Sequence, residues 1–142
     1  MKKIFTAFLL TVCVGFLVQA QTPVESPSFQ WVSEVYDFGN IPQGIPAVAS
    51  YEFINTGKSA LIITDVQKTC GCTNTEWPQE PVMPGQKGTI KATYNAASDG
   101  AFTKAITVNS NSSTPSVKLT FKGTVVKESS APENQTIFNS GN

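Results

Sequence analysis

Apolar and polar residues alternate along most of the chain after residue 28, as they do in strands that bury one face. The clearest runs are Tyr51-Glu52-Phe53, Ile90-Lys91-Ala92-Thr93-Tyr94, Ile106-Thr107-Val108-Asn109 and Val117-Lys118-Leu119-Thr120-Phe121-Lys122. Because one phase of each run is apolar, we expect that phase to point into a shared core. Its members are Tyr51, Phe53, Ile90, Tyr94, Ile106, Val108, Leu119 and Phe121.

Turn-forming residues separate these runs, at Asn55-Thr56-Gly57, Pro84-Gly85, Asp99-Gly100 and residues 110–115. Strands are predicted near residues 29–38, 47–55, 61–68, 80–83, 87–95, 102–110 and 116–126. About seven short strands at this spacing are typical of an all-β, immunoglobulin-like two-sheet sandwich. Gly123 interrupts the last predicted strand and indicates a bulge there.

The first residues have the plan of a signal peptide. Lys2 and Lys3 precede an apolar stretch over residues 4–18, and Val18-Gln19-Ala20 is typical of a cleavage site. We therefore expect a signal peptide over residues 1–20 and a secreted or periplasmic protein. The apolar stretch is shorter than the roughly 20 residues that span a bilayer, so no membrane span is predicted.

The remaining length is enough for one domain. Residues 21–28 contain two prolines and no periodicity, and we expect a flexible leader there. The sandwich is predicted over residues 29–127, followed by a polar tail, residues 128–142, that is expected to be disordered.

Charge and composition exclude several classes of function. Ten basic residues balance ten acidic ones, and the chain contains no histidine and no arginine. A nucleic-acid binder needs a basic surface, so no nucleic-acid partner is expected. Histidine is the usual general base and metal ligand near neutral pH, and its absence removes His-based triads and His-metal sites. We expect no enzyme active site, no cofactor and no metal site.

The reactive side chains gather at Cys70-Gly71-Cys72, because Cys13 falls within the signal peptide. An oxidising compartment and an even cysteine count favour a disulfide. Bonding residues i and i+2 requires a local bend, and Gly71 makes this bend easier because glycine can take φ > 0 without a Cβ clash. A second interpretation is a dithiol for redox exchange or Cu(I) binding, with Met83 as a thioether ligand. A third is a tight turn with two buried apolar thiols.

The loop from Cys70 to Pro78 is our candidate binding loop, with Gly71, Thr73 and Trp77 as its contact residues. Loops often carry binding residues, and Trp is enriched at binding hot spots. Trp77 also has a structural interpretation, in which it packs against the core.

Several motifs together resemble the bacterial DUF1573 family, a domain of unknown function. They are Asp37-Phe38-Gly39-Asn40-Ile41, Phe53-Ile54-Asn55-Thr56-Gly57, Leu61-Ile62-Ile63, Thr69-Cys70-Gly71-Cys72-Thr73, Pro84-Gly85 and Gly100-Ala101-Phe102-Thr103-Lys104. The resemblance implies an immunoglobulin-like sandwich, similar to Hydin-type domains, in an exported bacterial protein. It implies no activity and no catalytic residue.

These observations give two hypotheses of function. The leading one is a non-enzymatic module of the cell envelope that binds a protein or glycan through loops at one end or through an exposed edge strand. The alternative is a periplasmic thiol redox or copper-binding protein that uses Cys70 and Cys72.

Overall fold

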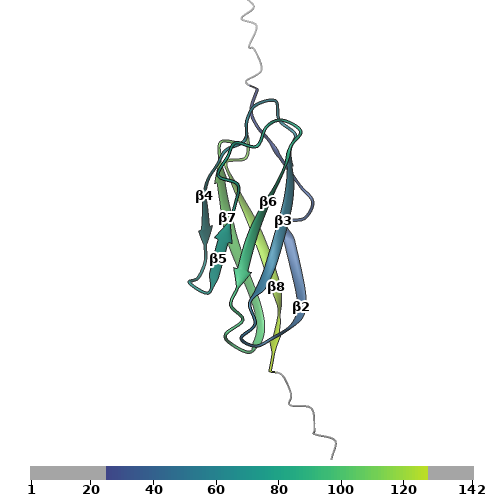
Figure 1. The fold of residues 1–142 in the computed structure, drawn as a ribbon, viewed down its shortest axis with the longest axis vertical. Coiled ribbons are helices and arrows are strands. Elements are labelled where there is room, and N and C mark those ends of the chain that lie inside the picture. Colours follow the sequence, from purple (N-terminus) through teal and green to yellow (C-terminus); the bar gives the residue numbers. More distant parts are fainter. Residues whose placement is uncertain (1–24, 128–142) are drawn as a thin grey trace, which may run out of the picture.

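The computed structural model describes residues 25–127, which form eight strands (Figure 1). Their bounds are β1 Phe29–Trp31, β2 Val35–Pro42, β3 Ala47–Asn55, β4 Ile63–Lys68, β5 Thr73–Glu76, β6 Lys87–Tyr94, β7 Gly100–Ser110 and β8 Ser116–Val126. One sheet has the strand order β1-β3-β6-β5 and the other β2-β8-β7-β4. Every pairing is antiparallel except that of β2 with β8, which is parallel. The predicted all-β, two-sheet sandwich is confirmed.

The alternating residues form the core between the sheets. Tyr51, Phe53, Ile90, Tyr94, Ile106, Val108, Leu119 and Phe121 are all buried, which confirms the predicted strand phases. Aromatic rings account for much of this core. The ring of Phe102 stacks on Tyr94 with the centroids 4.4 Å apart, and both rings contact Phe121.

The strand predictions differ from the structure in three places. The strand expected over residues 29–38 is two strands in different sheets, because the chain crosses the sandwich after Trp31. Ser33 stabilises the crossing segment, since its hydroxyl accepts a bond from the Val35 amide and donates one to the Val35 carbonyl. The strand expected at 80–83 is an isolated bridge of Val82 to Leu61. β5 was not predicted, because its sequence Thr-Asn-Thr-Glu contains no apolar residue.

The bulge predicted at Gly123 lies in the neighbouring strand. The β2–β8 register shifts between Asp37 and Asn40, where Gly39 adopts a φ of 63°. A Cβ at Gly123 would lie 2.8 Å from the Gly39 carbonyl oxygen, so Gly123 provides the space that the bulge fills. The Gly39 amide donates to the Asp37 carboxylate at 2.9 Å, and this bond lowers the pKa of Asp37.

Asn55 organises the end of the sandwich at which the described chain begins, which we call the asparagine end (residues 25–28, 56–61, 82–86 and 110–115). Its side chain is fully buried. The Asn55 Oδ1 accepts bonds from the amides of Ser28 and Gly57, and its Nδ2 donates to the carbonyls of Ser59 and Val82. One side chain therefore joins three separate segments of the backbone through four hydrogen bonds.

The expected leader is only partly described. Residues 25–28 are bound to the sandwich, since the Pro27 and Ser28 carbonyls accept bonds from the amides of Ser113 and Thr56, and Pro27 packs over Gly57. The predicted signal peptide, residues 21–24 and the predicted tail lie outside the described residues. Within residues 25–127, no helix has the length and apolar character needed to cross a membrane.

Candidate functional site

Several loops meet at the opposite end of the sandwich, which we call the cysteine end. It consists of loop residues 43–46, turn residues 69–72, loop residues 95–99 and Val126. Main-chain bonds join these parts. The Asn95 amide donates to the Cys72 carbonyl at 3.1 Å, the Gly44 amide to Ala96 at 2.9 Å, and the Gln43 amide to Val126 at 2.9 Å. The cysteine turn is therefore fixed to its neighbouring loops.

Ala96 gives the 95–99 loop an uncommon backbone. It is fully buried and adopts a φ of 50°, a conformation that non-glycine residues seldom take. The Asn95 side chain supports this turn by accepting a bond from the Ala97 amide at 3.3 Å. The loop beside Cys72 is thus held in one specific shape.

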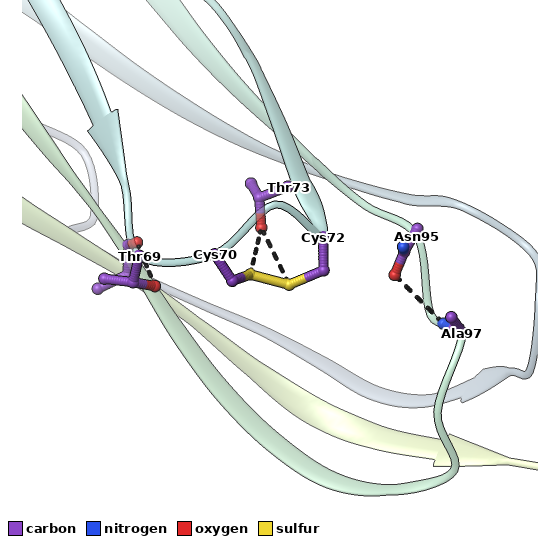
Figure 2. The surroundings of a disulfide bond; sticks show 7 residues. Thr69, Cys70, Cys72, Thr73, Asn95 and Ala97 are labelled. Atoms are coloured by element: carbon purple, nitrogen blue, oxygen red, sulfur yellow. Dashed lines mark hydrogen bonds between the residues drawn. A yellow bond between two sulfur atoms is a disulfide. The ribbon is translucent and has the colours of Figure 1, made fainter.

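The structure places the sulfur atoms of Cys70 and Cys72 within bonding distance, with the two Cα atoms 5.3 Å apart (Figure 2). Both residues are half-buried, and Gly71 between them is exposed. Gly71 does not use the positive φ that glycine tolerates, because its φ lies outside the left-handed region. A Cβ at Gly71 would also meet no atom within 4 Å, so neither the backbone nor packing inside this domain requires glycine there.

Thr73 lies next to the two sulfur atoms, with its hydroxyl directed at both (Figure 2). Its side chain is 2% exposed, so it has no surface to offer a partner in the candidate binding loop. Its hydroxyl oxygen lies 3.6 Å from the Cys70 Sγ and 4.0 Å from the Cys72 Sγ (Figure 2). Among the described residues, these sulfur atoms are the partners of that hydroxyl. The structure therefore assigns Thr73 to the cysteine pair itself.

The third residue of the candidate loop, Trp77, is half-buried and packs against the core cluster. This placement agrees with the structural interpretation of Trp77. Of the three candidate binding residues, Gly71 alone remains exposed.

A depression of about 470 Å³ lies beside the cysteine turn. Cys72, Asn95, Thr103 and Lys104 contribute to its wall, and the rings of Tyr94 and Phe102 lie deeper in it. Lys104 is half-buried on the phase of β7 that carries the buried residues Phe102 and Ile106. Sequence analysis missed this residue, although a lysine on the inward phase of an alternating strand is a detectable signal.

The family of the chain is established by its sequence over most of the described domain. Residues 29–125 match the family model described as "Protein of unknown function (DUF1573)". The chain belongs to the DUF1573 family. No curated protein matches the sequence significantly.

Solved structures similar to this DUF1573 domain share its fold. A protein of unknown function from Porphyromonas gingivalis W83 is 17% identical with a TM-score of 0.64, over 75% of this chain and 50% of that one. The ASH/PapD-like domain 7 of human CEP192 is 11% identical with a TM-score of 0.62, over 82% and 97% of the two chains. The Vibrio cholerae VesB protease is 13% identical with a TM-score of 0.54, over 70% and 31%. At these identities the likeness shows an immunoglobulin-like, PapD-like β fold and nothing about activity.

The structure separates the proposed copper ligands of this DUF1573 domain. Met83 lies before the start of β6, whereas Thr73, next to Cys72, pairs with Tyr94 at the end of β6. The seven residue steps along β6 span roughly 23 Å at about 3.3 Å per residue. Met83 and the cysteine pair therefore cannot hold one ion. Residues 25–127 contain no group of three or more His, Cys, Asp or Glu side chains placed to bind a metal.

Proposed function

We propose that this DUF1573 protein is an exported, non-enzymatic module of the bacterial cell envelope that binds a partner protein through its cysteine end. The observation that carries the proposal is an exposed apolar surface beside the depression. Ile45 is 56% exposed and Val126 is 38% exposed, and both adjoin Pro42, which pairs with Val126 in the β2–β8 ladder. Exposed apolar side chains rimmed by polar groups are typical of protein interaction sites.

The rigidity of the cysteine end supports a binding role. The main-chain bonds between residues 43–46, 69–72 and 95–99 hold the loops in place before a partner arrives. A surface that is already ordered loses less conformational entropy on association, which favours affinity. Binding through an edge strand is less favourable here, because β1 and β5 are short, β2 contains a bulge and a proline, and the register of β4 shifts between Ile63 and Asp65.

Export and the absence of enzymatic chemistry rest on the sequence. The charged start, the apolar stretch and the small-residue site at Ala20 support secretion into the periplasm or beyond. The absence of histidine leaves Ser and Thr hydroxyls without the base that usually activates them. Intact mass of the exported protein tests the first point, and a start at Gln21 is expected.

A photo-crosslinking side chain at position 45 tests the binding surface in living cells. We expect a defined crosslinked protein at position 45 and none at position 32, because Val32 is equally apolar, is 74% exposed and lies away from the cysteine end. The substitution Ile45→Glu should abolish a crosslink placed at position 126, and Val32→Glu should leave it unchanged. Equal crosslinking from positions 45 and 32 would contradict a specific surface.

The cysteine pair supports a second candidate function, thiol chemistry. The observation that favours it is the buried Thr73 hydroxyl, which faces both sulfur atoms. Copper binding through this pair would depend on two thiolates alone, since Met83 lies at the other end of β6.

A further inference from the structure

We infer that Cys70 and Cys72 form a disulfide that exchanges with cysteine thiols of a protein docked at the cysteine end. The inference rests on the proposed function for its partner, and it adds the chemical class of that partner: an exported protein that presents a dithiol. It draws on the Thr73 hydroxyl, the uncovered Gly71 and the depression beside Cys72.

The Thr73 hydroxyl suits a thiolate better than a disulfide. A disulfide sulfur is a weak acceptor, yet within residues 25–127 the Thr73 hydroxyl, in a residue that is 2% exposed, has these two sulfur atoms as its partners. When the disulfide opens, the departing sulfur becomes a thiolate and accepts a charge-assisted bond from this hydroxyl. The Cys70 Sγ is the nearer of the two, at 3.6 Å against 4.0 Å for the Cys72 Sγ. Thr73 therefore favours Cys70 as the leaving group.

The depression lies on the Cys72 side of the turn, away from Cys70. A nucleophile that displaces the Cys70 sulfur has to reach Cys72 from this side. Figure 2 shows Cys72 on the side that faces Asn95 and Ala97, and Cys70 on the side of Thr69. Cys72, not Cys70, contributes to the wall of the depression. Lys104 lines the same wall, and its positive charge attracts an incoming thiolate. A partner thiolate in the depression therefore attacks Cys72.

Gly71 leaves room for that attack. A Cβ at Gly71 would meet no atom of the domain, so the space beside the turn is open to a partner. Glycine is used where a ligand approaches the backbone closely. A partner can therefore come close to the sulfur atoms of Cys70 and Cys72.

The reaction balances as an exchange. The partner thiolate bonds to the Cys72 Sγ, the Cys70–Cys72 bond breaks, and its electron pair goes to the Cys70 Sγ, which takes a proton from water. The second partner thiolate then attacks the partner sulfur of the mixed disulfide and releases Cys72 as a thiolate. The partner loses two electrons and gains a disulfide, while the Cys70–Cys72 pair becomes a dithiol.

The site of attack can be read from a trapped intermediate. The full exported protein is mixed with a neutral peptide containing one cysteine, quenched with iodoacetamide and digested for mass spectrometry. We expect the peptide on Cys72 and the carbamidomethyl group on Cys70. Attachment to Cys70, an even distribution over both cysteines, or no mixed disulfide would overturn the inference.

The rate of disulfide reduction in Thr73 variants tests the role of the Thr73 hydroxyl. Thr73→Val should slow reduction by dithiothreitol about tenfold, the effect of losing one hydrogen bond to a charged group. Thr73→Ser should restore the rate, and Thr75→Val, in the same strand, should leave it unchanged. The Cys72→Ser variant gives a second readout, because adding Thr73→Val to it should raise the pKa of the Cys70 thiol. Unchanged rates and an unchanged thiol pKa in Thr73→Val would refute the assignment.

Two experiments distinguish a failure of the proposed disulfide exchange from a failure of the proposed binding surface. In the Cys70→Ser, Cys72→Ser double variant, a crosslink from position 45 should persist, because the apolar surface is intact. A persistent crosslink together with an unreactive wild-type disulfide would refute the exchange alone. An exchanging disulfide without any position-45 crosslink would refute the proposed surface.

Discussion

Single side chains with buried polar atoms determine much of the precision of this sandwich. Asn55 and Thr73 are both buried, and the polar atoms of each side chain bond to specific neighbouring groups. Asn55 joins backbone segments at the asparagine end, whereas Thr73 faces the sulfur atoms at the cysteine end. Buried polar groups are costly without partners, so the consequences of removing either side chain are specific and measurable.

Replacing Asn55 with alanine should destabilise the fold by about 3 kcal/mol or more. The Ser28 and Gly57 amides and the Ser59 and Val82 carbonyls would lose their partner, and each unpaired buried group costs roughly 1–3 kcal/mol. Urea titration measures the loss. Asn74→Ala, at an exposed position in β5, is the control and should change stability by less than about 0.5 kcal/mol.

Replacing Phe53 with alanine should cost about 3–5 kcal/mol, the usual range for a buried phenylalanine. Its ring is fully buried, contacts Phe29 and Trp31 at centroid distances of 5.1 Å, and covers Gly88 on the neighbouring strand. Thermal unfolding followed by circular dichroism gives the comparison with wild type. A loss below about 1 kcal/mol would show that the core refills the space.

The burial of Phe53 could be predicted from the sequence, whereas the roles of Asn55 and Thr73 could not. Phe53 is readable because it lies on the apolar phase of an alternating strand. Asn55 lies in a turn motif, and nothing in the local pattern shows that distant segments surround it. Thr73 was singled out as a contact residue, but its burial depends on the pairing of β5 with β6, which alternation did not reveal.

At the scale of elements, the first predicted strand joins two runs of different phase. The inward residues are the odd-numbered Phe29 and Trp31 before the crossing and the even-numbered Tyr36 and Phe38 after it. One continuous strand cannot change phase in this way, so the break between the two runs was a signal of the crossing that the strand prediction overlooked. The bulge was also predicted in the wrong strand. Gly123 in β8 lies beside the bulge, but the extra residue belongs to β2.

The bulge leads to a prediction about Gly123. An alanine there would place its Cβ 2.8 Å from the Gly39 oxygen and 3.0 Å from the Phe102 ring, so the β2–β8 ladder must shift. We expect Gly123→Ala to destabilise the domain by about 1–3 kcal/mol, the usual cost of overpacking. Gly71→Ala is the matched control and should leave urea unfolding unchanged, because the space around Gly71 is empty. Equal effects of the two substitutions would contradict the role of the close approach.

At the scale of the whole molecule, we expect the sandwich to stay folded without its cysteine pair. Closing a loop of three residues contributes roughly 1.5 kcal/mol by chain entropy. The Cys70→Ser, Cys72→Ser double variant should therefore lose no more than about 2 kcal/mol in a denaturant titration. Reduction with a mild dithiol should leave the β-sheet circular dichroism unchanged, and unfolding on reduction would show that the pair is a structural staple.

The described chain starts at the asparagine end and finishes at the cysteine end, at opposite extremes of the long axis (Figure 1). Tension applied through residues 25 and 127 would therefore run nearly along the strands. β2 and β8 lie side by side in parallel, and pulling β8 outward slides it along β2. Their hydrogen bonds are then loaded together in shear instead of opening one by one. The domain should therefore resist stretching far better than its modest size suggests.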